Sequence, residues 1–148
     1  MTVPSPMDIA ARAADRRANA ELIARHLAPG VLVGRERFRR VHARAVWESA
    51  LTPHCRLVAL ALATHGNFRT GEMRHQPRLA GLVTATGLSP AQVAVALNAL
   101  VQRGWVSRTG PRAYESADLQ PHIPAGALAR YRARRVADRI AREHLASA

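Results

Sequence analysis

The chain has 148 residues and a mass of 16.1 kDa, which suits one domain, or one small domain with helical extensions. All 22 basic residues are arginine, a usage typical of GC-rich genomes, and with 10 acidic residues the net charge is +12. Aromatic residues make up only 4% of the chain, which excludes a platform of stacked rings for single-stranded nucleic acid, and the single cysteine excludes an internal disulfide or a cysteine-based zinc cluster.

Residues 1–50 are predicted to form an N-terminal helical extension. Residues 6–28 are rich in alanine, the best helix former, and Pro29-Gly30 ends this first helix. A short apolar segment leads to a second helix over 35–50, in which apolar residues share one face and arginines another.

Residues 51–118 are predicted to form the central domain, and two capping signals divide them. Thr52-Pro53 and Ser89-Pro90 each place a capping side chain before a proline, whose missing N–H costs nothing at the first helical position. These signals predict helices that begin at Pro53 and Pro90.

Glycines end the helices of this central domain. The first helix is predicted to end at Gly66 and the second at Gly104. Between them, a polar loop over 66–76 precedes a short helix, 77–86, which ends at Gly87.

A β-hairpin and a last helix are predicted after Gly104. The strands are expected over 105–108 and 113–116, because Thr109-Gly110-Pro111-Arg112 between them has turn composition. The segment DLQPHIP is expected to be irregular, and residues 125–146 of the C-terminal segment 119–148 form an arginine-rich helix. Together, these elements predict a mainly α fold with a small β-hairpin.

This order of elements resembles the winged helix-turn-helix domains of bacterial, plasmid and phage regulators, which share their core with the MarR and GntR families. The resemblance covers about residues 51–116, through LTPHCRLVALALATHGN and PRLAGLVTATGLSPAQVAVALNALVQRGWVSR. Its most specific parts are Leu79-Ala80, Thr86-Gly87-Leu88-Ser89, Val93, Leu97, Leu100 and Gly104-Trp105-Val106. It implies that the helix after Ser89 enters the major groove of DNA, that the hairpin contacts adjacent phosphates, and that terminal helices form a homodimer.

The helix after Ser89, called the recognition helix below, and the segments around it contain the candidate site residues. The residues expected to face bases are Ser89, Ala91, Gln92, Val95 and Asn98. The residues expected to contact phosphates, or to lie on the hairpin, are Arg78, Arg103, Arg108, Thr109 and Arg112. Few of the base-facing residues are polar, and Val95 stands where the related families usually carry a polar or basic group. Specificity is therefore expected from A·T-rich sequence and DNA shape, or it is modest.

Positive charge is spread along the chain. The segments 1–50, 51–118 and 119–148 hold 9, 7 and 6 basic residues against 5, 3 and 2 acidic ones, so each carries +4. Such a field favours DNA, RNA, an anionic membrane surface or an acidic protein, and a merely solvated surface is the alternative. On the last helix, a basic stripe is predicted from Arg132, Arg135, Arg139 and Arg142.

No enzymatic activity, cofactor or metal is expected. The histidines show no HxxxH or HExxH spacing, and Cys55 is interpreted as a small buried apolar residue. The histidines are His26, His42, His54, His65, His75, His122 and His144.

We therefore expect a cytoplasmic, nucleoid-associated transcription regulator that binds double-stranded DNA and no membrane. The first alternative is an adaptor whose apolar recognition helix and arginine stripe bind an acidic protein partner. The second is an accessory factor in the replication or maintenance of a plasmid or phage.

Overall fold

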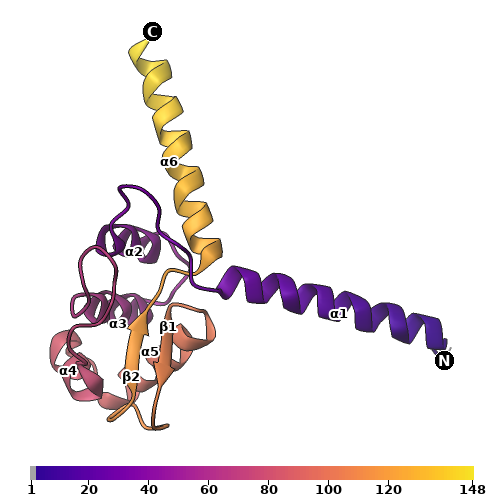
Figure 1. Cartoon of the computed structure of the whole chain (residues 1–148), viewed down its shortest axis with the longest axis horizontal. Coiled ribbons are helices and arrows are strands. Elements are labelled where there is room, and N and C mark those ends of the chain that lie inside the picture. Colours follow the sequence, from indigo (N-terminus) through magenta and orange to yellow (C-terminus); the bar gives the residue numbers. More distant parts are fainter. Residues whose placement is uncertain (1–2) are drawn as a thin grey trace.

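The computed structural model describes residues 3–148, and it is mainly helical with one two-stranded antiparallel sheet. The prediction of a mainly α fold with a small β-hairpin is therefore confirmed. The elements are α1 (Pro6–Leu27), α2 (Phe38–Trp47), α3 (Pro53–Ala63), α4 (Arg78–Thr86), α5 (Pro90–Gln102), β1 (Val106–Thr109), β2 (Asp118–Pro121) and α6 (Ala125–Ala146) (Figure 1).

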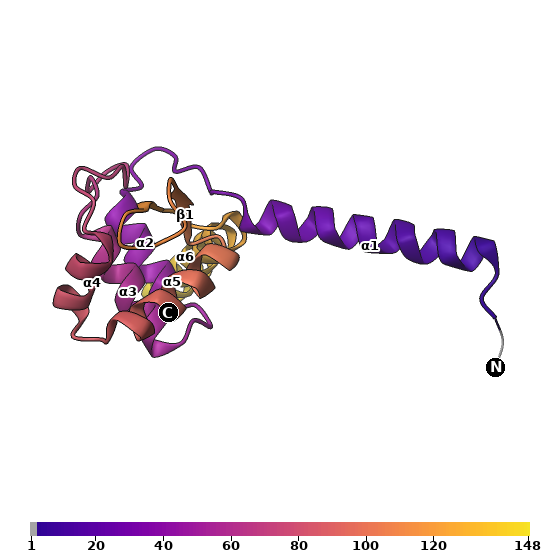
Figure 2. The same cartoon turned by 90° about the horizontal axis from the view of Figure 1, so that it is seen from below.

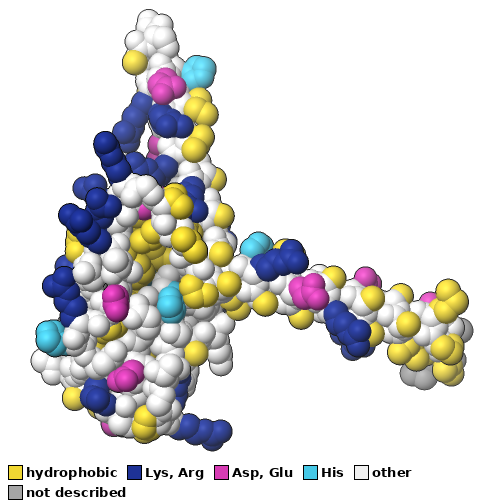
Figure 3. Space-filling model, in the orientation of Figure 1, with side chains coloured by type: hydrophobic (Ala, Val, Ile, Leu, Met, Phe, Trp, Pro, Cys, Tyr) yellow, Lys and Arg dark blue, Asp and Glu magenta, His cyan; other side chains and the backbone are white. Residues whose placement is uncertain are grey.

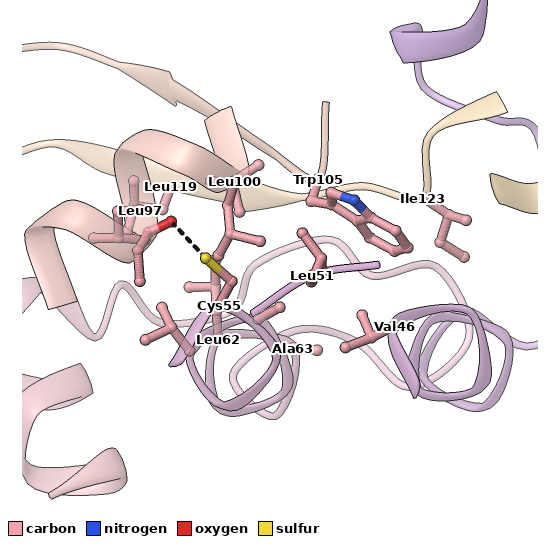
Figure 4. Close-up of a cluster of buried hydrophobic side chains, with 14 of the residues drawn as sticks. Val46, Leu51, Cys55, Leu62, Ala63, Leu97, Leu100, Trp105, Leu119 and Ile123 are labelled. Carbon is pink, nitrogen blue, oxygen red and sulfur yellow. Dashed lines mark hydrogen bonds between the residues drawn. The ribbon is translucent and has the colours of Figure 1, made fainter. Parts of the chain in front are cut away.

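Helix α3 lies at the centre of the core, because it packs against α2, α4 and α5. Its buried residues return every three or four positions, as one face of a helix requires: Cys55, Val58, Ala59, Leu62 and Ala63. Figure 4 shows Leu97 and Leu100 of α5 and Leu119 of β2 converging on this face, with Trp105 and Ile123 beside them. Each of these large side chains contributes about 1.5–3 kcal/mol by leaving water.

Both predicted capping signals are present. The hydroxyl of Thr52 accepts a hydrogen bond from the Cys55 amide at 3.4 Å, and that of Ser89 accepts one from the Gln92 amide at 3.2 Å. Each cap is worth about 1 kcal/mol because it pairs an amide that the first turn leaves free. At the other end of α4, Gly87 adopts a left-handed conformation (φ 72°), which lets the chain turn into α5 at an angle of 106°.

The second helix is shorter than predicted. It was expected over 35–50, whereas α2 spans Phe38–Trp47. Glu36 accepts hydrogen bonds from the Val33 amide and from Arg132 of α6, which hold the preceding residues in a loop. A contact between residues 96 positions apart thus overrides the local helical pattern.

The second strand lies elsewhere than predicted. It was expected over 113–116, but β2 spans Asp118–Pro121 and pairs Val106 of β1 with Pro121. Residues 113–117 instead form a turn, in which the Ala117 amide donates to the Ala113 carbonyl at 3.0 Å. The DLQPHIP segment, expected to be irregular, provides the strand because its alternate residues are buried in the core.

The two terminal helices extend away from this core (Figures 1 and 2). No residue of α1 is buried, and Tyr131 is the last buried residue of α6. The helices are joined at their bases, where the Ala125 amide donates to the Ala28 carbonyl at 2.8 Å. Gly104 also lies so close to Leu27 that a Cβ there would collide with the Leu27 carbonyl oxygen.

Within the described residues, no single helix is both long and apolar enough to cross a membrane. The pair α4 and α5 reaches that apolarity only when the two helices are taken together, and they are sharply bent relative to each other.

Candidate nucleic-acid interface

The residues predicted to face DNA bases lie on the exposed side of α5. Ser89, Ala91, Gln92, Val95 and Asn98 are all exposed, whereas the opposite side of the helix is buried against α3. Val95 is 69% exposed in the middle of this face. Because α1 and α6 extend away from the core, they leave the face open to solvent.

The side chains of Ser89 and Gln92 on this face already bond to each other's backbone amides. The side-chain carbonyl of Gln92 accepts a hydrogen bond from the Ser89 amide at 3.0 Å, which completes the cap of α5. A bidentate contact with adenine uses both ends of a glutamine amide, so it would compete with this cap. The nitrogen of the Gln92 side chain forms no hydrogen bond with any of residues 3–148.

Asn98 links α5 to the segment between the strands. Its side-chain carbonyl accepts a hydrogen bond from the Tyr114 hydroxyl at 2.5 Å, and the Tyr114 ring is buried. Tyr114 was expected in a strand over 113–116, and no role was predicted for its side chain. Asn98 therefore holds the hairpin loop against α5.

Arg108 also organises the hairpin loop. Its guanidinium donates to the carbonyls of Pro111 and Arg112, and it stacks on the Tyr114 ring at 4.7 Å from the ring centre. These contacts close the loop between the strands. Arg112 and Thr109 remain exposed in the same hairpin.

Two further arginines lie exposed on segments that adjoin α5. Arg103 caps the C-terminal end of the helix, and Arg78 begins α4. Arg78 has a positive φ of 55°, the only non-glycine residue of 3–148 in this region. Arg78, Arg103 and Arg112 are thus exposed on three segments near α5: the start of α4, the end of α5 itself and the hairpin loop.

A small apolar pocket beside α5 was not predicted. It measures about 360 Å³ and lies between the start of α3 and the side of α5 that carries Ala91, Val95 and Ala99. Cys55 lines its floor, where the buried thiol donates to the Ala96 carbonyl at 3.8 Å. The i, i+4 spacing of these small residues was the signal in the sequence, since it places them along one line of the helix.

The predicted basic stripe of α6 has two parts with different surroundings. Arg132 forms a two-pronged ion pair with Glu36, at 2.9 and 2.8 Å, and this pair lowers the pKa of the Glu36 carboxyl below its ordinary value. Arg135 donates to the Tyr131 hydroxyl at 2.8 Å. Arg139 and Arg142 lie further along α6, are exposed, and form no ion pair with any residue of 3–148.

The histidines do not gather into a site. Within residues 3–148, no three His, Cys, Asp or Glu side chains lie close enough to hold a metal ion. The Nε2 atom of His122 and the Ser107 hydroxyl share a hydrogen bond of 2.8 Å. Partial burial lowers the pKa of the His122 ring. His42 is buried in the core.

The candidate interface therefore consists of an open, mostly apolar helix face with arginines on the adjoining segments and a hairpin loop fixed to its side. Comparisons of the chain with protein-family models, with curated proteins and with solved structures gave no significant match.

Proposed function

We propose that the chain is a DNA-binding transcription regulator of the winged helix-turn-helix type, which inserts α5 into the major groove of a duplex. The observation that carries this proposal is the exposed face of α5, which neither terminal helix covers. The angle of 106° between α4 and α5 supports it, because helix-turn-helix pairs meet at about 90–120°.

In this proposal, arginines provide most of the affinity. Arg78, Arg103 and Arg112 contact phosphates on both sides of the groove, and Arg108 acts mainly by shaping the hairpin loop. Each phosphate contact releases counterions, so the affinity falls as salt rises.

Sequence preference comes from a small set of contacts. Ala91 and Val95 suit the methyl group of thymine, and the free amide nitrogen of Gln92 can donate to a base. Since few groups read base edges directly, the deformability and groove width of the DNA contribute the rest. We expect preference for A·T-rich duplexes over G·C-rich ones.

Salt-dependent binding of Arg112→Gln tests the proposal. The full chain is titrated against a labelled random duplex of about 20 bp at rising NaCl concentrations, with fluorescence polarisation as the readout. Loss of one phosphate contact should weaken binding to all sequences and reduce the slope of log K against log salt by about one.

The matched control is Arg12→Gln, which removes the same charge from the exposed surface of α1. It should leave the slope unchanged. The proposal is wrong if the unmodified chain shows no affinity for duplex DNA at low salt, or if both variants change the slope equally.

A second candidate function is supported by the apolar pocket beside α5. Ala91, Val95 and Ala99 could pack against an apolar side chain of another protein, with Arg103 at the edge. In this adaptor function, Val95→Glu abolishes binding of the protein partner, and duplex DNA is not a ligand. The arginine stripe of α6 would take no part, because none of its residues lines this pocket.

A further inference from the structure

A groove of about 1010 Å³ runs between α2 and the exposed part of α6, and its lining combines apolar and basic side chains. Leu60 of α3, Ala43 and Trp47 of α2 and Val136 of α6 provide the apolar part. The basic lining residues are Arg40, Arg44, Arg135, Arg139 and Arg142. Figure 3 shows arginine side chains gathered over α2 and along the adjacent side of α6.

Large apolar side chains in the groove are exposed to solvent. Trp47 is 68% exposed at the end of α2, and Val136 is 46% exposed opposite it. The other tryptophan of the chain, Trp105, is buried. A large aromatic ring left in water is typical of a surface that packs against a partner, because such rings dominate the energetics of interfaces.

The charges of the groove are mostly unpaired. Arg44 pairs with Glu48 at 2.8 Å and Arg135 donates to Tyr131, but Arg40, Arg139 and Arg142 have no hydrogen bond or ion pair to any of residues 3–148. Against five arginines, the lining holds only Asp138 and Glu143. The groove therefore complements an occupant that carries several negative charges.

The groove is also separate from the face of α5. Helix α3 packs against both α2 and α5, and no residue of α4 or α5 lines the groove, which lies where α6 extends away from the core (Figures 1 and 2). A duplex held at α5 would therefore leave the groove accessible.

We propose that this groove docks an acidic amphipathic helix from a partner protein. The apolar side of such a helix would pack on Trp47, Leu60 and Val136, and its acidic side chains would pair with Arg40, Arg139 and Arg142. A nucleic acid fits less well, because its backbone presents phosphates to an apolar floor, and of the two aromatic rings in the lining, Trp47 and Tyr131, only that of Trp47 is exposed for stacking.

The test uses the intrinsic fluorescence of Trp47. The probe is a tryptophan-free peptide of about 18 residues with leucines at i, i+3, i+4 and i+7 and glutamates elsewhere, which makes one apolar face. Binding should move the emission of the full chain to shorter wavelength, because the exposed indole of Trp47 leaves water while Trp105 is buried already. A scrambled peptide of the same composition, without an apolar face, should bind at least about tenfold more weakly.

Three variants locate the site. Trp47→Phe should keep most of the peptide affinity, measured by polarisation of labelled peptide, but lose the emission shift. Trp47→Ser and the pair Arg139→Gln with Arg142→Gln should each weaken binding about tenfold. All three positions are exposed, so folding should not depend on them. Arg16→Gln with Arg17→Gln, on α1, removes the same charge and should change nothing.

Equal binding of the scrambled peptide, or equal loss in the α1 control, would overturn the proposal in favour of unspecific charge attraction. If duplex DNA displaces the peptide and the groove variants lose affinity for DNA, the groove is a nucleic-acid surface and the proposal is wrong. The proposal stands independently of DNA binding at α5, because the Arg112→Gln variant should bind the peptide normally.

Discussion

At the scale of single residues, His42 is the buried side chain with the largest effect on pH dependence. Its ring stacks on Phe38 at 5.0 Å and meets the edge of Trp105 at 5.8 Å, and neither ring nitrogen has a hydrogen-bond partner among residues 3–148. Burial lowers its pKa from 6.5 to about 4. Below pH 6.5 the unfolded chain therefore binds a proton that the folded chain does not, and stability falls as the pH falls toward 4.

The change His42→Leu should remove this dependence. Between about pH 7.5 and about pH 4.5, the free energy of unfolding of the unmodified chain should fall by about 2–3 kcal/mol more than that of the variant. Urea unfolding followed by circular dichroism at both pH values measures the difference. Replacing the exposed His54 by Ala is the control, and equal pH dependence of all three proteins would show that His42 is not the cause.

Tyr114 offers a second test at this scale. Removing its hydroxyl in Tyr114→Phe leaves the ring in the core but breaks the bond to Asn98, which should cost about 1 kcal/mol of stability. Amide hydrogen exchange of residues 110–117 should become faster, while exchange in α3 stays the same. Unchanged exchange in the loop would mean that Arg108 alone holds it.

At the scale of elements, local signals account for most of what the sequence predicted. The caps at Thr52 and Ser89 and the turn at Gly87 depend on neighbours within a few residues, so composition and order reveal them. The start of α2 and the position of β2 could not be predicted in this way. Arg132 and the core that buries Leu119 determine them, and both lie far along the chain.

The helix α1 leads to a prediction of its own. Ile9, Ala13, Ala20, Ile23 and Leu27 recur on one side of a helix that buries none of its residues. If this stripe forms the expected homodimer, Ile9→Glu with Ile23→Glu should give a monomer, because it places charges in the interface. Light scattering after gel filtration measures the mass. The control, Leu22→Glu, alters an equally exposed residue on another side of α1 and should leave the dimer intact.

At the scale of the whole molecule, the sequence was enough to predict which face of α5 is exposed. It was not enough to predict which partners the arginines of α6 contact. Helical spacing of the arginines along α6 predicted one continuous stripe, yet Arg132 ties the helix to Glu36 whereas Arg139 forms no ion pair with any of residues 3–148. The groove beside Trp47 likewise depends on how α6 crosses α2, and no local pattern encodes that crossing. The net charge thus predicted a negatively charged partner. Which surface of the molecule presents free arginines depends on the tertiary contacts.

The close approach of Gly104 to Leu27 has a mechanical consequence. It seats the base of α1 against Gly104, two residues after the end of α5, so the projecting helix is a lever attached beside the proposed DNA-reading element. A helix of 22 residues is about 33 Å long, close to the roughly 34 Å of one turn of DNA. Tilting this lever by about 10° at its seat would carry its tip through about 6 Å. If two copies of the chain join through these levers, a methyl group added at Gly104 would therefore change the spacing between their two α5 helices without replacing any residue of α5.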